Sequence, residues 1–325
     1  MIDENDSDDL RGATRRPGAV VTVGTFDGVH RGHLAVIDEV RRQARIRNAR
    51  SVVVTFEPHP LRVVRPEEAP LLLTTPEERH ALLAATGVDE IGTLRFTREM
   101  ASFSPRRFVE EILIARFGMT HLVMGYDHGL GRGRSGDVDA LRRIGDELGF
   151  GVDVVPALTI DDAPISSTRV REALARGDVA FAARGLGRPY SLHGDVVRGA
   201  GRGRELGFPT ANLDVADPQK LLPLEGIYAV QARGADGRAR DGVLHLGPRP
   251  TFEDAPPSIE LHLFDFEGDL YGRRIEVAFC GRIREIRAFP DVESLIAAMH
   301  EDCARARGLF EAGGGACQGS GAVLM

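Results

Sequence analysis

The sequence contains almost no lysine, and this shortage excludes several ways of handling phosphate. Lysine and arginine together number 41 among 325 residues; Lys220 is the single lysine and the other 40 are arginines. A P-loop needs Gly-Lys-Ser/Thr, but Lys220 is followed by Leu221. No lysine stands in the strand context of a protein kinase, and a Schiff-base enzyme could use only Lys220, in a polar Asp-Pro-Gln-Lys turn. Arginine, histidine, backbone N–H groups or a metal must therefore bind any nucleotide phosphate.

Tryptophan is absent and cysteine is scarce. An aromatic ligand must therefore stack on Phe or Tyr. The three cysteines, Cys280, Cys303 and Cys317, are far apart and form no Cys-x-x-Cys pair. This pattern predicts neither a disulfide framework nor a zinc knuckle, and it favours a reducing cytoplasm.

Long apolar runs and a net positive charge are also missing. No run approaches the ~18 apolar residues of a membrane helix, and the acidic residues 1–9 are the reverse of a signal peptide. The formal net charge of -7 argues against a protein that binds duplex nucleic acid. We therefore expect a cytoplasmic protein with neither a membrane nor a nucleic-acid partner, and we leave self-association open.

The length predicts about two domains, between tails at residues 1–17 and 311–325 that we expect to be disordered. Within residues 18–184, strand and helix patterns alternate. Strands are expected at 19–23, 51–56, 91–96, 121–124 and 152–155. Helices are expected at 34–44, 76–86, 105–117, 138–148 and 169–175. This alternation predicts a parallel, doubly wound α/β domain.

The pattern changes after about residue 185. Apolar and polar residues then alternate with period two at 227–231, 259–263 and 275–279, between Gly, Pro and Asp-Gly turns. Residues 185–310 are therefore expected to form a small antiparallel β-barrel with a C-terminal helix at 292–306.

The first candidate site is the segment from Gly24 to His33, between the first expected strand and helix. Ligands of open α/β sheets bind at the carboxyl ends of strands, and Gly28 and Gly32 permit a tight turn and a close backbone approach. His30 and His33 share one face of the first helical turn, where the helix N-terminus attracts anions. Two imidazoles there could stabilise a phosphate during nucleotidyl transfer, although zinc binding or a purely structural role is also compatible with the spacing.

A second group of polar residues comes before the helix expected at 169–175. Ser166, Ser167 and Thr168 stand where N-cap residues stand. Together with Arg171, their hydroxyls and the free N–H groups could form an anion cradle without lysine. A plain N-cap is the alternative interpretation.

The C-terminal half has a Gly- and Arg-rich loop at 199–209 followed by Thr210-Ala-Asn212. Thr210 and Asn212 offer hard oxygen ligands for a Mg²⁺ that carries nucleotide phosphates. By strand alternation, Glu260 faces away from Ile259 and Leu261. Glu260 could therefore serve in a site or simply face solvent.

The motifs of the N-terminal half resemble a known family. His30-Arg-Gly-His33 is similar to the His-x-Gly-His motif of nucleotidylyltransferases, and residues 22–33, 55–60, 125–137 and 165–171 resemble the bacterial bifunctional riboflavin kinase/FMN adenylyltransferases, or FAD synthetases. The resemblance implies that FMN is adenylylated to FAD with release of pyrophosphate. It implies catalytic roles for His30 and His33, FMN contacts from His59 and Asp127, and ATP contacts from Gly24, Phe26, Asp27, His30, Gly32, His33, Ser167, Thr168 and Arg171.

The motifs of residues 202–284 resemble the riboflavin kinase domain of the same family, which implies a six-stranded barrel that phosphorylates riboflavin to FMN with ATP. The resemblance implies that Thr210 and Asn212 hold Mg²⁺ with ATP, and that Glu260 is the general base. It also implies ATP or flavin contacts from Gly201, Arg204, Phe208, Thr210, Asn212 and Arg284. Neither half offers a covalent nucleophile, so we expect direct in-line transfer at both sites.

The chain departs from the family pattern at four positions. His128 and Leu130 replace the usual Phe, His245 replaces Asn, and Met299 replaces Gln. The departures at 128, 130 and 245 leave open an enzyme in which one half is inactive. A non-catalytic flavin sensor is the second alternative, but retention of His30, His33, Thr210, Asn212 and Glu260 counts against it. The residues expected to contact the flavin ring are Phe208, Tyr228 and Phe252.

Overall fold

The computed structural model describes residues 18–126, 129–199, 203, 207–248, 257–312 and 317. The chain divides into two compact units. The first contains the described residues up to Phe26, with His33–Ala69 and Leu82–Ala157. The second contains Asp27–Gly32, Pro70–Ala81 and the described residues from Leu158 onward.

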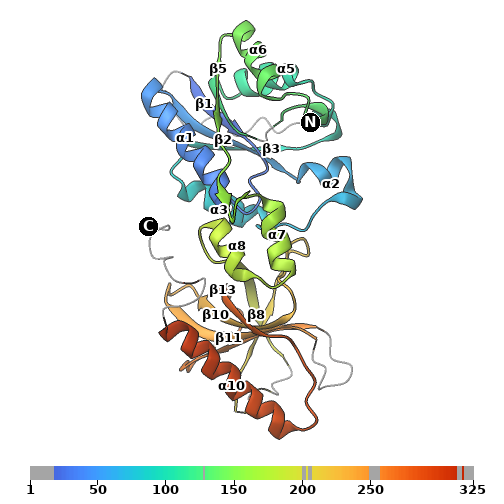
Figure 1. The fold of residues 1–325 in the computed structure, drawn as a ribbon, viewed down its shortest axis with the longest axis vertical. Helices are drawn as coiled ribbons and strands as arrows, with labels where there is room; N and C mark the ends of the chain where they lie inside the picture. The colour runs from blue at the N-terminus through green and yellow to red at the C-terminus, as the bar shows by residue number, and fades with distance from the viewer. Residues whose placement is uncertain are drawn as a thin grey trace. The chain divides into compact units, whose positions relative to one another are not determined.

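The first unit contains a five-stranded parallel sheet in the order β3-β2-β1-β4-β5 (Figure 1). Its strands are β1 Ala19–Val23, β2 Arg50–Glu57, β3 Glu90–Arg95, β4 Met119–Gly125 and β5 Gly151–Val155. In chain order, the longer helices between these strands are α1 Arg31–Arg47, α3 Pro76–Ala85 and α6 Val138–Leu148, and the first residues of α3 belong to the second unit. This confirms the expected doubly wound α/β architecture, with a change of winding direction between β1 and β4.

Alternating faces of the strands explain the core of the first unit. Val21 and Val23 of β1 pack into one apolar cluster. Val20 packs into a second cluster, on the opposite face of the sheet, with α1 residues such as Val40. Both faces of the sheet are therefore buried, as parallel strands require.

Shorter elements complete the first unit. They are α2 Pro60–Val64, η1 Pro66–Glu68, α4 Arg98–Ala101, α5 Pro105–Phe108, η2 Val109–Ile114 and η3 Arg132–Arg134. The single helix expected at 105–117 is thus an α-helical turn, α5, followed by a π-helical segment, η2. The apolar periodicity marks the helix but not this local change of winding.

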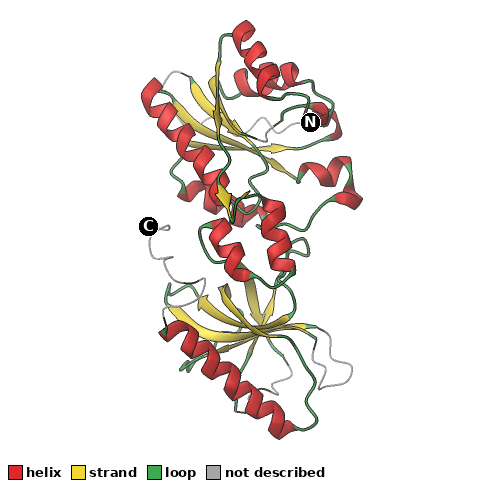
Figure 2. Cartoon of the chain, in the orientation of Figure 1, coloured by secondary structure: helices red, strands yellow, loops and turns green. Residues whose placement is uncertain are grey.

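The second unit contains a β-barrel (Figure 2). This barrel is closed and has six strands in the order β10-β11-β12-β9-β8-β13. Its neighbouring strands are antiparallel. The strands are β8 Ser191–Val197, β9 Ala211–Asp214, β10 Gly226–Arg233, β11 Ala239–Gly247, β12 Ser258–Leu263 and β13 Arg274–Arg284. The C-terminal helix α10 spans Val292–Glu311, and its Ala306 packs with Ala229 and Phe264 of the barrel. The expected barrel and helix are confirmed.

Two helices before the barrel share its hydrophobic core. They are α7 Ser167–Ala175 and α8 Val179–Leu186, preceded by the short pair β6 Thr159–Ile160 and β7 Ala163–Pro164. Val170 and Leu174 of α7 belong to the same cluster as Val230 and Phe279 of the barrel. Residues 158–184, which the sequence groups with the α/β domain, thus pack with the barrel. The functional division between 18–184 and 185–310 stays a prediction.

The cysteines differ from the expectation in one respect. Cys280 of β13 and Cys317 form a disulfide, with Cα atoms 4.8 Å apart. Residue spacing does not predict this pairing, because the two cysteines are 37 positions apart. Within the described residues, no helix combines the length and the apolar character needed to cross a lipid bilayer.

Candidate functional site

In the first unit, the chain turns sharply at the carboxyl end of β1. Phe26 is buried and has φ of 48°, in the left-handed region that L-residues seldom adopt. Its ring meets the His33 ring edge-on, with centroids 5.1 Å apart. A Cβ at Gly24 would lie 3.2 Å from the Phe26 ring, so a side chain there would crowd it. Phe26 therefore supports the His33 ring, and Gly24 leaves room for Phe26.

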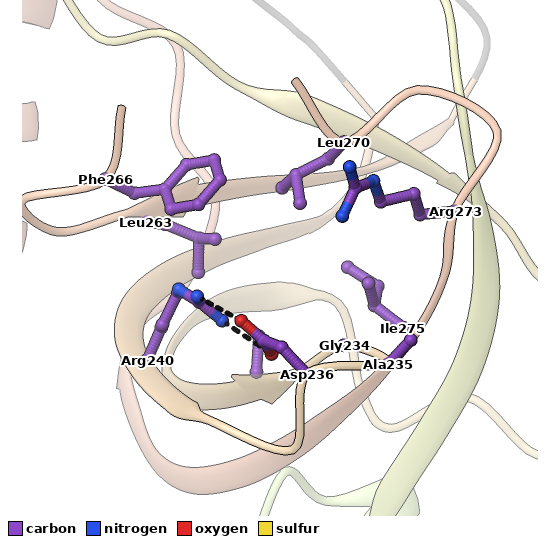
Figure 3. Close-up of a pocket in the computed structure, with 10 residues that line it drawn as sticks. Gly234, Ala235, Asp236, Arg240, Leu263, Phe266, Leu270, Arg273 and Ile275 are labelled. Carbon is purple, nitrogen blue, oxygen red and sulfur yellow. Dashed lines mark hydrogen bonds and ion pairs between the residues drawn. The ribbon is translucent and has the colours of Figure 1, made fainter. Parts of the chain in front are cut away.

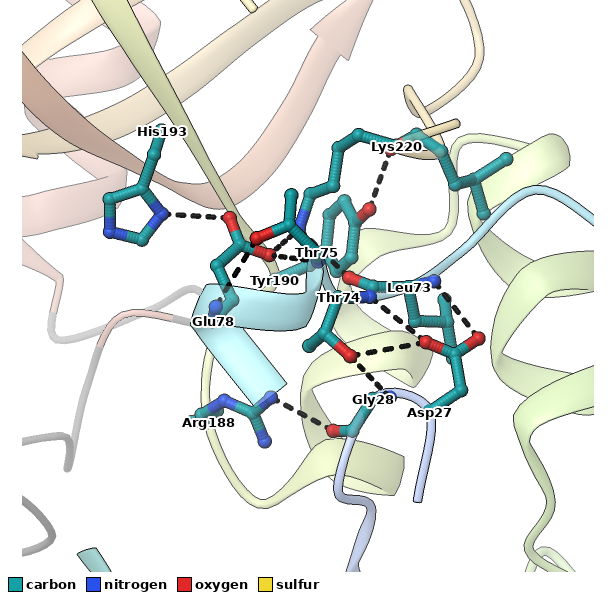
Figure 4. A network of polar contacts seen from close by, with 11 residues as sticks. Asp27, Gly28, Leu73, Thr74, Thr75, Glu78, Arg188, Tyr190, His193 and Lys220 are labelled. Atoms are coloured by element: carbon teal, nitrogen blue, oxygen red, sulfur yellow. Dashed lines mark hydrogen bonds and ion pairs between the residues drawn. The ribbon is translucent and has the colours of Figure 1, made fainter. Parts of the chain in front are cut away.

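Asp27, in the second unit, is fully buried and is held by the segment after residue 70 (Figure 4). Its carboxylate accepts hydrogen bonds from Leu73 N at 3.1 Å, Thr74 N at 3.0 Å and Thr74 Oγ1 at 3.1 Å. Arg171 adds an ion pair from Nη2. The Thr74 hydroxyl also accepts from Gly28 N at 3.0 Å. Four donors on one buried carboxylate fix the backbone just before His30.

His30 is buried, with only 6% of its surface exposed. Burial lowers its pKa to about 4, and the Asp27 carboxylate opposes only part of this effect. The ring is therefore neutral at physiological pH. A Cβ at Gly32 would lie 3.0 Å from the His30 ring, so glycine is needed for this close approach.

The polar residues at the start of α7 differ in their surroundings: some form hydrogen bonds within the protein, and one is exposed to solvent. Ser166 alone caps the helix, accepting from Arg169 N at 3.3 Å. Ser167 Oγ donates to Asp27 O at 2.8 Å, and Arg171 donates to Asp27 and, from Nε at 2.9 Å, to Leu71 O. Thr168 is exposed. The structure thus brings Asp27, Ser167 and Arg171 together as one hydrogen-bonded group.

Arg188 is a site residue that the motifs did not reveal. Its guanidinium donates to Gly28 O at 2.8 Å and Val29 O at 3.2 Å. Val29 has φ of 39°, which is strained for a β-branched side chain. Burial lowers the pKa of Arg188 to about 10, so the side chain stays charged. The hydrogen-bond geometry, and no sequence motif, identifies it.

The predicted FMN contacts are only partly visible. His59 is buried and serves as the N-cap of α2, accepting from Leu61 N at 3.3 Å through Nδ1. Asp127 and His128 lie outside the described residues. Leu130 is buried in the core of the first unit and pairs with Gly136 through two backbone hydrogen bonds. Its difference from the usual Phe is therefore a change in core packing.

In the barrel, Thr210, Asn212 and Glu260 lie together. Thr210 Oγ1 donates to Glu260 Oε2 at 3.2 Å, and Ser258 Oγ donates to Glu260 Oε1 at 3.0 Å. Asn212 of β9 is the register partner of Glu260 on β12. His245, one of the departures from the family pattern, is the register partner of Glu260 on the other side. Hydroxyl, amide and carboxylate oxygens thus gather at one place.

The segment before Thr210 is anchored by aromatic contacts. Phe208 is buried, and its ring centroid lies 5.5 Å from that of His262 and 4.8 Å from that of His300. His262 Nδ1 bonds to Pro209 O at 2.9 Å. Tyr228, by contrast, is fully buried, packs edge-on against Phe279 and donates its hydroxyl hydrogen to Leu224 O. The expectation that Tyr228 contacts the flavin is therefore wrong: alternation places its side chain in the core.

Arg284 has a structural partner in α10. Its Nε and Nη2 donate to the two oxygens of Asp302, both at 2.8 Å, and Nη1 donates to Glu285 O at 2.9 Å. Both side chains of this ion pair are largely buried. The other predicted nucleotide contacts, Gly201 and Arg204, lie outside the described residues, as does Phe252.

A small cavity lies at the barrel end where β10 leads into β11 (Figure 3). Its volume is about 50 Å³, far below the roughly 300 Å³ that small-molecule sites need. The Arg240–Asp236 ion pair lies at its wall. Glu260, near the start of β12, is not among the lining residues, which are Ala232, Gly234, Ala235, Asp236, Arg240, Leu263, Phe266, Leu270, Arg273 and Ile275.

Comparisons with known proteins point to the same family for both halves of the chain. The family model for FAD synthetase matches residues 13–169, and the model for riboflavin kinase matches residues 186–310. A bifunctional riboflavin kinase/FMN adenylyltransferase of Pseudomonas fluorescens is 40% identical over 293 residues, covering 90% of this chain and 93% of the relative. The protein of the same description from Bacillus subtilis is 36% identical and covers 87% and 90%. A crystal structure described as a macrolide-efflux protein from Streptococcus pneumoniae is 31% identical, with a TM-score of 0.81, covering 90% and 94%.

Proposed function

Because this chain belongs to the bifunctional riboflavin kinase/FMN adenylyltransferase family, we propose which residues carry out each of its two reactions. It phosphorylates riboflavin to FMN and adenylylates FMN to FAD. The observation that carries the assignment is that the motif residues form two separate polar groups: one around Asp27 and His30, the other around Thr210 and Glu260.

For adenylylation, His30 and His33 stabilise the charge that develops on the ATP phosphates. A phosphate oxygen of FMN attacks the α-phosphorus, the bond to the bridging oxygen breaks, and pyrophosphate leaves. A neutral imidazole, as burial makes His30, donates one hydrogen bond without carrying a full charge. Thr168, exposed at the start of α7, completes the phosphate contacts together with N–H groups at the α1 N-terminus.

The other predicted ATP contacts divide into two kinds. Gly24 leaves room for Phe26, whose ring contacts His33, and Gly32 leaves room for the His30 ring. Asp27, Ser167 and Arg171 act mainly by holding the loop, because their polar atoms are bonded to one another. FMN contacts from His59 and Asp127 stay predictions.

For phosphorylation, Glu260 takes the proton of the riboflavin 5′-hydroxyl while its oxygen attacks the γ-phosphorus and ADP leaves. Thr210 and Asn212 would hold Mg²⁺, and their oxygens beside the Glu260 carboxylate are the hard ligands that this ion prefers. Bound there with ATP, Mg²⁺ would neutralise phosphate charge. In the described part of the chain, no three His, Cys, Asp or Glu side chains gather into a metal site. ATP phosphates and water would supply further ligands, as is usual for Mg²⁺.

Paired variants test the two assignments. With riboflavin, ATP and Mg²⁺ as substrates and chromatographic separation of products, His33→Ala should slow FAD formation about 10²-fold and spare FMN formation. Glu260→Gln should slow FMN formation, while FAD formation from supplied FMN continues. His80→Ala and Glu267→Gln, both exposed, are matched controls.

Three outcomes would contradict the proposal. If both activities fall together in either variant, two independent sites are the wrong description. If the wild-type protein makes no FAD from FMN, one half is inactive. Flavin binding without any turnover would instead indicate a sensor. The cytoplasmic location, the absence of membrane and nucleic-acid partners, and self-association stay predictions.

A further inference from the structure

The single lysine of the chain is buried in the second unit. Lys220 is 4% exposed, and its main chain forms a bridge with Leu72. Its ammonium group donates to Leu73 O at 2.8 Å, forms an ion pair with Glu78, and lies 4.7 Å from the centre of the Tyr190 ring (Figure 4). The turn expected from the sequence is present, with Lys220 N donating to Asp217 O at 3.1 Å, but the Lys220 side chain is buried.

Glu78, at the start of α3, joins Lys220 to a barrel strand. One carboxylate oxygen accepts from Thr75 N at 3.0 Å, and the other bonds to His193 Nδ1 of β8 at 2.8 Å. Burial alone would raise the pKa of Glu78, but the bonds from His193 and Lys220 outweigh it and lower the pKa to about 2. Glu78 therefore stays ionised at physiological pH.

The segment from Leu73 to Thr75 contacts both Asp27 and this charged group. On one side, the amides of Leu73 and Thr74 hold the Asp27 carboxylate at 3.1 and 3.0 Å. On the other, Leu73 O accepts from Lys220, and Thr75 N donates to Glu78. Displacement of this segment would therefore displace Asp27, and with it the backbone that carries His30.

We propose that Lys220 and Glu78 are positioning residues for FMN adenylylation: they fix the 73–75 segment, and this segment sets the place of the loop that carries His30. This inference rests on the proposed role of His30 and His33. It gives a residue in the kinase half of the sequence, Lys220, a part in the other reaction.

An alternative is that the pair serves only stability. A buried ion pair adds little net stability, and a pair of apolar side chains of similar size can replace it at little cost. The Lys220–Leu73 hydrogen bond is different, because an apolar side chain cannot hold that carbonyl oxygen in place. A double substitution can therefore separate the two roles.

The test uses three variants of the full chain: Lys220→Met, the double variant Lys220→Met/Glu78→Met, and the control Arg240→Met. The control breaks a surface ion pair of the same unit, Arg240–Asp236. Thermal unfolding, FMN formation from riboflavin, and kcat and KM for FAD formation from FMN are measured for each. All assays run well below the unfolding midpoint of the least stable variant.

We expect kcat for FAD formation to fall at least about tenfold in Lys220→Met, because small displacements of a reacting group are costly. FMN formation should stay within about twofold. In the double variant, thermal stability should recover while FAD formation stays low. The Arg240→Met control should leave both activities unchanged.

Two results would overturn the inference. The first is an equal loss of both activities in Lys220→Met. The second is recovery of both FAD formation and thermal stability in the double variant. If Lys220→Met does not fold, the double variant alone tests the inference. His33→Ala in the same series keeps this test separate from the proposed function: if it leaves FAD formation intact, the assignment of the histidines has failed instead.

Discussion

Arg188 donates a hydrogen bond to the carbonyl oxygen of Gly28 at 2.8 Å, although the two residues are 160 positions apart. A second bond reaches Val29 O at 3.2 Å, so one guanidinium holds two successive carbonyl groups just before His30. The planar fork of arginine makes two such bonds in fixed directions, which an ammonium group cannot do. The loop is therefore held in its strained conformation by a residue from the start of the barrel domain of the sequence.

Substitution of Arg188 by lysine should impair adenylylation selectively. The charge is kept, but the two-carbonyl contact is lost, so Arg188→Lys should lower kcat for FAD formation about tenfold. FMN formation in the same preparation should change little. Arg184→Lys, which alters an exposed arginine paired with Asp161, is the control. Wild-type FAD formation in Arg188→Lys would show that the contact does not position the loop.

Gly28 should be intolerant of a side chain for two separate reasons. Its φ is +79°, and a Cβ would lie 2.7 Å from Leu73 Cδ1. Gly237 has a similar φ of +68° with nothing within 4 Å of the Cβ position, so it isolates the backbone effect. Gly237→Ala should cost about 1–2 kcal/mol, and Gly28→Ala about 1–3 kcal/mol more through overpacking. Urea unfolding of both variants measures the difference, and equal losses would contradict the predicted contact with Leu73.

The buried state of His30 predicts a loss of stability at acidic pH. In the folded protein its pKa is about 4, below the 6.5 of an exposed histidine. Between these values the unfolded chain binds a proton that the folded chain does not, so the free energy of unfolding falls as pH drops from 6.5 to 4. The lost stability is about 3 kcal/mol at most.

Comparison with His30→Gln isolates this contribution. The difference in free energy of unfolding between wild type and variant should shrink as pH falls from 7 to 4.5, with urea unfolding as the measurement. A difference that stays constant over this range would show that the folded-state pKa of His30 is near its usual value.

The sequence predicted the regular elements well because their signals are local. A β-branched run marked β1, and period-two alternation marked the barrel strands. Thr75 stands at the predicted N-terminus of α3, where its hydroxyl accepts from Glu78 N at 3.2 Å. The partners of buried polar groups were not predictable in this way. Asp27 meets Arg171 across 144 residues, and Lys220 meets Glu78 across 142. Such pairs depend on how the elements pack, which no local pattern encodes.

The motifs located the candidate site residues, but they did not distinguish residues placed to contact a ligand from residues that hold other site residues in position. Ser167 and Arg171 stand in a motif expected to bind phosphate, but the structure bonds both to Asp27. Tyr228 was expected at the flavin because it is aromatic, whereas its place in β10 directs the side chain into the core. Residue type and spacing indicate which chemistry a side chain could perform. Its partners in the folded structure decide whether it is placed to contact a ligand or to hold another residue.

Arg284 allows this distinction to be tested at the kinase site. Its three guanidinium nitrogens donate to Asp302 and to Glu285 O, so we expect it to hold α10 on the barrel. Asp302→Leu leaves a largely buried guanidinium without its carboxylate and should destabilise the protein by about 3 kcal/mol or more. Arg305→Met, in an exposed ion pair with Glu301, should cost less than about 1 kcal/mol.

The double variant Arg284→Met/Asp302→Leu removes both charges and should recover most of the stability lost in Asp302→Leu. If Arg284 acts only through α10, KM for ATP in FMN formation should stay within about twofold of wild type in this variant, since no nucleotide contact is removed. If Arg284 binds nucleotide, the restored protein should still show a KM for ATP raised by about tenfold or more, because a charged hydrogen bond contributes about 1.5–3 kcal/mol. Calorimetric unfolding and initial rates over a range of ATP concentrations separate the two roles.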